Sequence, residues 1–210
     1  SDQLASVPDP RVQRFAPKLL RSLERAIAFC QSTLSYGRAQ EAAPDRRVIM
    51  VEPAVAEVRE SAGLATDVSI TWISAIERGL TIDADPDQLF RVLLNLVRNA
   101  TQALESRQDG DGGAQQIRIT GRREGTVAII EVSDTGPGVP AKAREHLFEA
   151  FQTSGRPGGS GLGLAIAAEL IRAHGGHIHL VEGTIGATFR ISIPDRPVEL
   201  LSVRSERARA

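Results

Sequence analysis

Apolar side chains near the start of the chain recur at the spacing of one helix face. Seven residues share this face, at intervals of 3, 4, 4, 3, 4 and 4: Val12, Phe15, Leu19, Leu23, Ala26, Cys30 and Leu34. This heptad-like spacing predicts a helix over about residues 9–38 that packs its stripe on a second helix or on another copy of the chain. Pro17 interrupts the pattern, and we expect it to kink the helix or to mark its start.

Beyond a polar linker with Gly37 and Pro44, short strand-like segments are interleaved with helical ones. Strands are predicted at Val48–Val51, Val68–Ile73, Leu80–Ile82, Ile117–Thr120, Val127–Val132, His177–Val181 and Thr188–Ile193. Helices are predicted at Pro53–Ala62, from Asp85-Pro86 to about Ser106, near Lys142–Phe148 and at Gly161–His174. The second and third strands alternate like a pair, and hairpins are expected around Gly125 and near Gly183–Gly186. No regular βαβ repeat is present, so the predicted fold class is α+β: a helical arm followed by an α/β sandwich with helices on one face of an antiparallel-rich sheet.

Composition and charge narrow the classes of function. The 210 residues carry a net charge of −1, which provides no overall basic field for nucleic acid or an anionic membrane. The single cysteine, Cys30, allows no disulfide within the chain and is typical of a reducing compartment. No apolar run approaches the ~20 residues of a membrane span. Because the start has neither Met nor a signal peptide, we expect a cytoplasmic fragment of a longer protein, without membrane contact of its own.

The long helix that begins at Asp85 carries a polar stripe beside its apolar face. Asn95, Asn99 and Gln102 lie 4 and 3 residues apart, so their side chains share one face. An amide oxygen is a hard, neutral ligand for Mg²⁺, and an amide NH₂ group can donate to a phosphate. A solvated helix face explains the stripe equally well, so the helix alone does not decide between the two.

Asp134 follows the strand-like segment IIEVS and opens the sequence Asp-Thr-Gly-Pro-Gly. A carboxylate at a strand end can accept a hydrogen bond from the amino group of adenine. Gly136 and Gly138 would let a planar base approach the backbone. A turn closed by an Asx hydrogen bond is the plainer interpretation, and on this motif alone it is favoured.

A glycine-rich loop, residues 158–163, leads into the helical segment AIAAELIRAHGG. Such a loop at a helix N-terminus offers free N–H groups and the positive end of the helix dipole to phosphates. No Lys-Ser/Thr pair follows, so the loop is not a P-loop. No parallel βαβ unit surrounds it, so it is also unlike the dinucleotide-binding fingerprint.

Taken together and in this order, the motifs resemble the catalytic ATP-binding domain of bacterial sensor histidine kinases, within the wider Bergerat (GHKL) ATPase fold. NLVRNATQAL is similar to the N box, DTGPGVP to the G1 box and HLFEAFQTSG to the F box. GSGLGLAIAAELIRAHGGHI is similar to the G2 box, and GATFRISIP to the closing strand. The resemblance covers about residues 48–194.

The resemblance implies a role for each candidate residue. Asn99 would ligate Mg²⁺, with Asn95 supporting the phosphates of ATP, and Asp134 would recognise adenine between Gly136 and Gly138. The remaining residues implied to border the nucleotide are Phe151, Arg156, Ser160, Gly161, Leu162, Gly163 and Thr188. The Gln152–Ser160 segment has the composition of a lid ordered by nucleotide.

The residue at position 95 separates phosphoryl transfer from hydrolysis. Gyrase, mismatch-repair and chaperone ATPases of this fold carry Glu four residues before the Mg-binding Asn, as a base that activates water. Here that position is Asn95, and an amide cannot take the proton. A neutral imidazole attacks phosphorus with its own lone pair, so the resemblance favours a histidine kinase over an ATP hydrolase.

The acceptor histidine is missing from the arm. Residues 1–42 resemble the end of a dimerisation hairpin, so the acceptor would lie upstream of Ser1. The domain would cover 46–194, with a flexible tail at 195–210. The four histidines present are interpreted as structural or surface residues: His146, His174, His177 and His179. We therefore predict a fragment that binds ATP and Mg²⁺, dimerises through the arm and serves a response regulator, but cannot autophosphorylate.

Two alternatives remain. A degenerate kinase-like module would dock a response regulator without using ATP, although Asn99, Asp134 and the glycine loop are all intact. A stand-alone protein kinase or anti-sigma relative is disfavoured by Asn95 and by the arm. Binding of Mg-ATP separates the first alternative from the histidine kinase.

Overall fold

The computed structural model describes residues 43–66, 69–106, 113–150 and 161–196. The predicted arm, Phe151, Arg156, Ser160 and the tail from 197 onward lie outside these ranges. The helices are α3 (Val51–Ser61), α4 (Pro86–Glu105), α5 (Ala141–Arg144) and α6 (Gly163–Ala173). The strands are β1 (Arg47–Met50), β2 (Thr71–Ile76), β3 (Thr81–Ala84), β4 (Gln116–Glu124), β5 (Val127–Asp134), β6 (His177–Leu180) and β7 (Thr188–Pro194).

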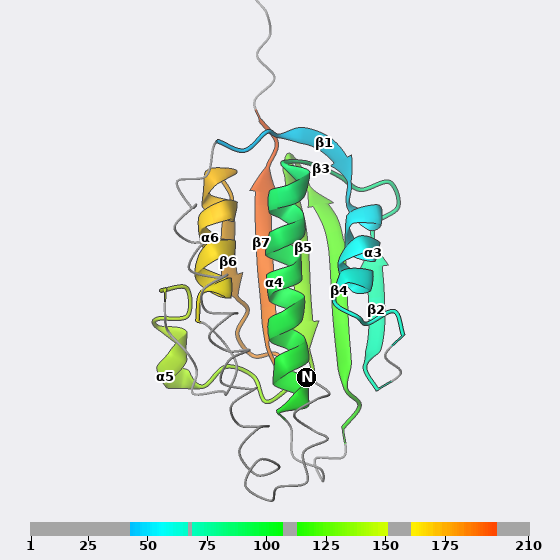
Figure 1. The fold of residues 1–210 in the computed structure, drawn as a ribbon. Helices are drawn as coiled ribbons and strands as arrows, with labels where there is room; N and C mark the ends of the chain where they lie inside the picture. The colour runs from blue at the N-terminus through cyan, green and yellow to red at the C-terminus, as the bar shows by residue number, and fades with distance from the viewer. Residues whose placement is uncertain (1–42, 67–68, 107–112, 151–160, 197–210) are drawn as a thin grey trace, which may run out of the picture.

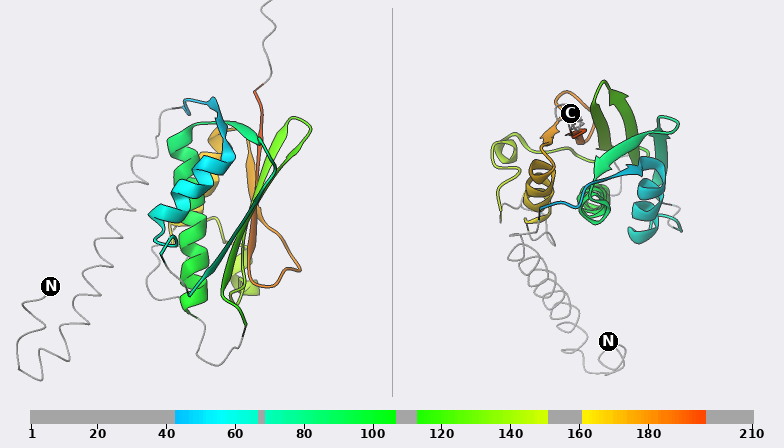
Figure 2. Two further views of the ribbon diagram at one scale, coloured as in Figure 1. Left: turned by 90° about the vertical axis from the view of Figure 1, so that its right-hand side faces the viewer. Right: turned by 90° about the horizontal axis from the view of Figure 1, so that it is seen from above.

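The described residues form two layers, a sheet and a set of helices on one of its faces (Figures 1 and 2). The main sheet has five strands in the order β2-β4-β5-β7-β6, and β1 pairs with β3 in a separate two-stranded sheet. All pairs in the main sheet are antiparallel except β2–β4, which is parallel. Helices α3, α4 and α6 lie on the same side of this sheet (Figure 2). The predicted α+β class is confirmed.

One predicted strand pairing is wrong. The sequence pairs the second strand with the third, but β2 lies parallel to β4 and β3 lies antiparallel to β1. After β2 the N–H of Leu80 donates to the carbonyl of Glu77, and the carbonyl of Leu80 then accepts from Val51. This turn directs the chain out of the main sheet toward β1. The chain returns through α4, which is the kind of long crossover that a parallel pair requires.

Element boundaries differ modestly from the predicted ones. Val51 begins α3 instead of ending a strand, and α5 ends at Arg144, short of the predicted Phe148. Strand β2 begins at Thr71, three residues later than predicted. Both predicted hairpins are present, around Gly125 and between β6 and β7. The described residues include Asp195 and Arg196, which the sequence assigned to the tail, and the Arg196 side chain donates to the carboxylate of Asp83.

Helix α4 is the centre of the core. Its predicted apolar face is fully buried: Leu89, Leu93, Leu96, Ala100 and Leu104. The side chain of Asp85 accepts from the backbone N–H groups of Asp87 and Gln88, at 3.0 and 3.1 Å, which confirms the predicted cap. Among the helices of the described ranges, none combines the length and apolar character needed to cross a membrane.

Candidate functional site

The polar stripe of α4 lies against the start of α6. Asn95 and Asn99 are half-buried, whereas Gln102 is exposed. A Cβ on Gly163, the first residue of α6, would lie 3.7 Å from the amide carbon and oxygen of Asn95. The N-box helix and the glycine loop, which are far apart in the sequence, are therefore in contact through Asn95.

The same face of α4 continues to the glycines after β5. A Cβ on Gly136 would lie 3.1 Å from the Cβ of Ala103. Asn95, Asn99 and Ala103 follow one another at intervals of four residues, so they line one helix face. Asn99 thus lies between the turn of α4 that meets Gly163 and the turn that meets Gly136.

Asp134 ends β5 and is oriented by two backbone donors. Its side chain is buried, and Oδ1 accepts from the N–H of Gly136 at 2.8 Å and from the N–H of Ala187 at 3.3 Å. These two hydrogen bonds fix the plane of the carboxylate. A carboxylate has about four lone-pair positions, so a ligand donor can be added to the two backbone donors.

Two glycines with positive φ allow the β6–β7 turn to pack on this loop. Gly186 has a φ of 71°, and a Cβ there would lie 2.0 Å from the carbonyl oxygen of Asp134. Gly138 has a φ of 72°, and its Cβ would lie 2.9 Å from the carbonyl oxygen of Gly186. No side chain fits at either position, so the glycines keep the backbone around Asp134 closely packed. Gly186 was predicted only as a turn residue, because its role depends on the pairing of β5 with β7.

The described end of the glycine loop, Gly161 to Gly163, leads into α6. Gly161 has a φ of 68°, and Leu162 is fully buried with its carbonyl accepting from Ile166 at 2.9 Å. Leu162 therefore anchors the loop in the core, and Gly163 opens a helix of 11 residues. The N–H groups of the first turn and the helix dipole favour negative charge at this end, beside Asn95.

Thr188 does not point toward Asp134. Its hydroxyl donates to Ser133 Oγ at 3.0 Å, and Thr188 pairs with Ser133 across β5 and β7. Because side chains alternate along a strand, Ser133 and Thr188 face the side of the sheet opposite to Asp134. The residue that reaches Asp134 is Ala187, through its backbone N–H. The sequence did not indicate Ala187, because any residue other than proline can supply a backbone N–H donor.

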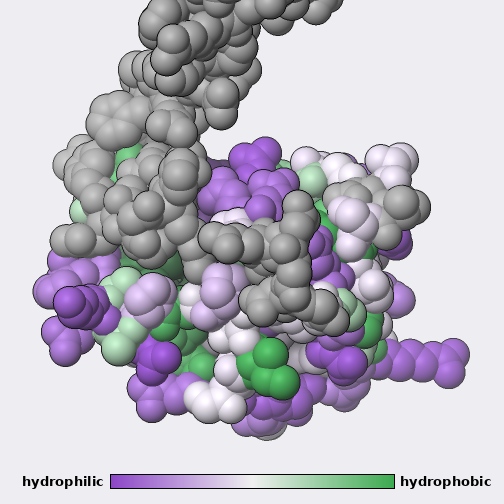
Figure 3. Space-filling view, turned by 90° about the horizontal axis from the view of Figure 1, so that it is seen from below, coloured by the Kyte–Doolittle hydropathy of each residue, from purple (hydrophilic) through white to green (hydrophobic). Residues whose placement is uncertain are grey.

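Phe148 is half-buried and packs against the core. Its ring meets that of Phe189 edge-on, with centroids 6.4 Å apart and an interplanar angle of 81°. Phe151, Arg156 and Ser160 lie outside the described residues, so their predicted contacts with nucleotide stay predictions. Figure 3 shows the lower end of the domain in Figure 1, where α4 ends. The described surface there mixes polar and apolar areas.

The histidines occupy structural or surface positions. His174 is buried, its Nδ1 lies 2.7 Å from the carbonyl of Leu170, and its Nε2 accepts from the N–H of Asp85. His146 is exposed, and its hydrogen bond to the Glu149 carboxylate raises the pKa of the imidazole. His177 and His179 are exposed on β6. Within the described ranges, no group of three or more His, Cys, Asp or Glu side chains could hold a metal ion.

A family model described as histidine kinase-, DNA gyrase B- and HSP90-like ATPase matches residues 84–197. The chain is 33% identical over 193 residues to the sensory histidine kinase/phosphatase NtrB of Rhodobacter capsulatus, covering 84% of this chain and 51% of the relative. It is 42% identical over 127 residues to the circadian input-output histidine kinase CikA of Synechococcus elongatus, covering 55% of this chain and 16% of the relative. The chain thus spans about half or less of these curated relatives.

Solved structures agree with the sequence relatives. Full-length ShkA in complex with AMPPNP superposes with a TM-score of 0.69 at 28% identity, covering 90% of this chain and 40% of ShkA. The catalytic domain of the histidine kinase ThkA superposes with a TM-score of 0.62 at 27% identity, covering 71% of this chain and 95% of that domain. The family model covers more than half of the chain, and the relatives and solved structures agree with it. The chain belongs to the histidine kinase-, DNA gyrase B- and HSP90-like ATPases and contains the ATP-binding domain of a sensor histidine kinase.

Proposed function

We propose that this domain binds Mg-ATP between α4, the Asp134 loop and the start of α6, and donates the γ-phosphoryl group to a histidine. The observation that carries the proposal is the meeting of three motifs around Asn99, with Gly163 at one side and Gly136 at the other. ShkA, the solved relative named above, was crystallised with the ATP analogue AMPPNP. The similarity of fold and motifs supports the same ligand class here.

Asp134 would select the base. The two backbone N–H donors that hold Oδ1 keep the carboxylate aligned, and the amino group of adenine would donate to it. Guanine presents a carbonyl oxygen at the same place, which would meet the carboxylate as a second acceptor. The tight packing of Gly136, Gly138 and Gly186 leaves the backbone beside Asp134 free of side chains that would block a flat ring.

Asn95 and Asn99 would act on the phosphates. Asn99 is the residue that would hold Mg²⁺ through its amide oxygen, and the ion would supply positive charge to the β- and γ-phosphates. Asn95 would donate from its amide NH₂ group, beside the N–H groups that open α6. Because an amide at position 95 cannot accept a proton, the site suits attack by an imidazole better than attack by water.

The acceptor histidine and the response regulator would both lie outside the ATP-binding domain. We propose that the acceptor histidine precedes Ser1 and that the phosphoryl group then passes to a response regulator. The curated relatives named above are histidine kinases, which supports this order of events. The present chain alone should therefore bind ATP without labelling itself.

Calorimetric titration tests the pocket. In the Asp134→Asn variant we expect affinity for Mg-ATP to fall about 10- to 100-fold, the loss of one hydrogen bond to a buried charged group. Asp87→Asn makes the same chemical change at an exposed position of α4 and should leave affinity unchanged. Equal affinities of the two variants would refute the adenine role.

Incubation with γ-labelled ATP tests the acceptor. We expect no acid-labile label on the chain, because none of its four histidines lies on the arm. Acid-labile label on the purified chain would contradict this expectation. A chain that neither binds Mg-ATP nor gains thermal stability from it would instead be the degenerate module.

A further inference from the structure

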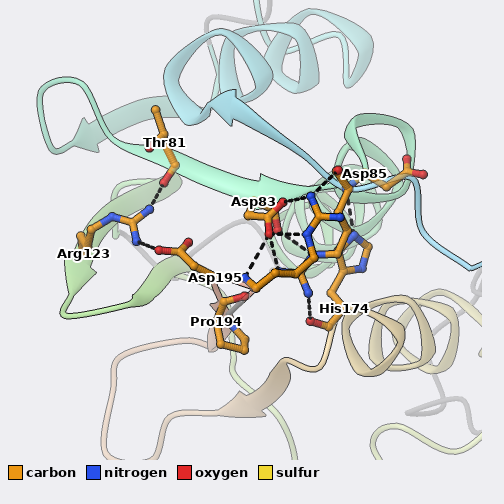
Figure 4. Close-up of polar contacts among 9 residues, drawn as sticks. Thr81, Asp83, Asp85, Arg123, His174, Pro194 and Asp195 are labelled. Carbon is orange, nitrogen blue, oxygen red and sulfur yellow. Dashed lines mark hydrogen bonds and ion pairs between the residues drawn. The ribbon is translucent and has the colours of Figure 1, made fainter. Parts of the chain in front are cut away.

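A second polar cluster lies at the opposite end of α4 and α6 from the candidate nucleotide site. It comprises Arg46, Asp83, Asp85, His174 and Arg196, which we call the clasp. Figure 4 shows Asp83, Asp85 and His174 close together in this cluster. In Figure 1 the clasp end is at the top, where β1 begins, α4 begins and β7 ends. Neither the motifs nor the proposed reaction accounts for this cluster.

Arg46 joins three separate elements through backbone carbonyls. Its Nε donates to the carbonyl of Asp83 at 3.1 Å, its Nη1 to that of His174 at 2.7 Å and its Nη2 to that of Pro194 at 2.5 Å. These carbonyls belong to β3, to the end of α6 and to the end of β7. Only 11% of the Arg46 side chain is exposed. A guanidinium has five N–H donors in a rigid planar fork, which allows one side chain to bond carbonyls of three separate elements at once.

Asp83 compensates the charge that Arg46 brings into this site. Its carboxylate lies 3.3 Å from Arg46 Nη2 and is 8% exposed. Arg196 donates to it from the backbone N–H at 3.1 Å and from the guanidinium at 2.9 and 3.0 Å. Burial pushes the pKa of Asp83 up, but the hydrogen bonds from Arg196 and the charges of both arginines outweigh this and hold the pKa below its ordinary value.

The backbone that carries Arg46 is fixed as well. The N–H of Asp45 donates to Asp85 Oδ2 at 2.9 Å, and the carbonyl of Arg46 accepts from Arg196 at 2.7 Å. His174 links the two helices, because its Nε2 accepts from Asp85 N–H and its Nδ1 bonds the carbonyl of Leu170. The chain is thus held from Asp45 onward, a few residues after the predicted arm ends.

The clasp and the pocket are joined by the same two helices. Helix α4 begins at the clasp, and Asn95 lies nine residues after Pro86, which is about 14 Å along the helix. Helix α6 begins at the pocket with Gly163 and ends at the clasp with His174. The contacts of Asp45 and Arg46 therefore attach this part of the chain to the same helices that position Asn95 and Gly163.

We propose that Arg46 is a positioning residue: it locks the connection from residues 1–42 onto the frame of α4, α6 and β7, and so sets the orientation of the ATP-binding domain relative to the arm. Arg46 contacts no nucleotide. The inference rests on the proposed function, since orientation matters chemically only where the phosphoryl group must reach a histidine of the arm.

Two residues that occur once each in the sequence allow the distance between domain and arm to be measured. Trp72, on β2, is the single tryptophan, and Cys30, in the arm sequence, is the single cysteine. Energy transfer from Trp72 to a dye on Cys30 reports the distribution of distances between domain and arm. In the Arg46→Ala variant we expect this distribution to shift or broaden. The affinity for Mg-ATP, measured on the same samples, should stay within about twofold of the wild type, well below the tenfold that corresponds to about 1.4 kcal/mol.

Arg47→Ala is the matched control. It removes the neighbouring arginine, which is exposed on β1, and leaves the three carbonyl contacts of Arg46 in place, so the distance distribution should match the wild type. An unchanged distribution in Arg46→Ala, or an equal change in both variants, would overturn the proposal.

Two further measurements keep these outcomes interpretable. If the dye at Cys30 disturbs the apolar stripe, the double variant Cys30→Ser, Gln31→Cys moves the label to the neighbouring residue, and the same outcomes apply. Failure of the wild type to bind Mg-ATP would count against the proposed function alone, because the distance measurement needs no nucleotide.

Discussion

The two ends of α4 differ in how their polar groups are bonded and buried. At the clasp end, Asp83 and Arg46 are buried and bonded to each other, and the backbone carbonyls around them are occupied. At the pocket end, glycines with positive φ replace side chains, and the amides of Asn95 and Asn99 are only half-buried. One end is closed by its own hydrogen bonds, whereas the other carries half-buried amide side chains that we propose to contact a ligand. We infer that changes at the clasp act mainly on stability or orientation, and changes at the pocket mainly on binding.

The largest expected effect is at Gly186. Alanine there would put a Cβ 2.0 Å from the carbonyl of Asp134 in a backbone with φ of 71°, so we expect a loss of more than about 4 kcal/mol or no folded protein. Gly183→Ala is the control, because Gly183 has a similar φ of 76° and nothing within 4 Å. It should cost only about 1–2 kcal/mol. Chemical denaturation measures both, and equal losses would mean that the close approach is not limiting.

Removing the carboxylate of the clasp comes next. In Asp83→Asn the buried Arg46 loses its counter-charge, and we expect the free energy of unfolding to fall by about 2–3 kcal/mol. Affinity for Mg-ATP below the unfolding temperature should not change, because Asp83 lies at the far end of α4. A large loss of affinity in a folded Asp83→Asn protein would remove the distinction between the two ends.

The clasp also predicts a pH dependence. The pKa of Asp83 is held below its ordinary value of 3.8 because the bonds and charges of the two arginines outweigh the effect of burial. The stabilisation is therefore fully present above that ordinary value and is lost as the pH falls through the lowered pKa of the folded protein.

Unfolding followed from about pH 6 to about pH 3 should show a shallower acid limb in Asp83→Asn than in the wild type. Glu131, whose pKa is lowered by Arg190 and Arg122 against the effect of burial, keeps part of the slope. Identical acid limbs in the two proteins would show that Asp83 does not titrate as described.

The smallest effect on stability is expected at Gly163. This residue opens α6 without a positive φ, and a Cβ would make only ordinary contact with Asn95, at 3.7 Å. Since alanine is about 1 kcal/mol better than glycine in a helix interior, Gly163→Ala should be as stable as the wild type or slightly more so. Its affinity for Mg-ATP should fall, because the methyl group enters the proposed phosphate site. Calorimetry that finds unchanged affinity would place the phosphates elsewhere.

The features that could be predicted are those set by local sequence. The Asp85 cap and the apolar face of α4 follow from residue type and spacing, and the structure places both as expected. Of the glycine run, the described residues Gly161–Gly163 lie at the start of α6, as the sequence predicts. The roles of Ala187 and Gly186 could not be predicted, because they depend on backbone groups brought to Asp134 by the β5–β7 pairing.

The clasp escaped prediction for a related reason. Its members are far apart in the sequence, and each one by itself resembles an ordinary surface residue: Arg46, Asp83, His174 and Arg196. Only the long-range pairing of β1 with β3, and the end of α6 beside them, brings the four together. The wrong pairing of the second and third strands had the same origin, since alternation indicates a strand but not its partner.

The most direct test of the central claim is a calorimetric titration of the wild-type chain with Mg-ATP and Mg-GTP side by side. The account predicts one saturable site per chain for Mg-ATP and much weaker or undetectable binding of Mg-GTP, because the oriented carboxylate of Asp134 accepts from an amino group and opposes a carbonyl. Equal affinity for the two nucleotides would contradict the role of Asp134, and the absence of heat with Mg-ATP would contradict the pocket itself.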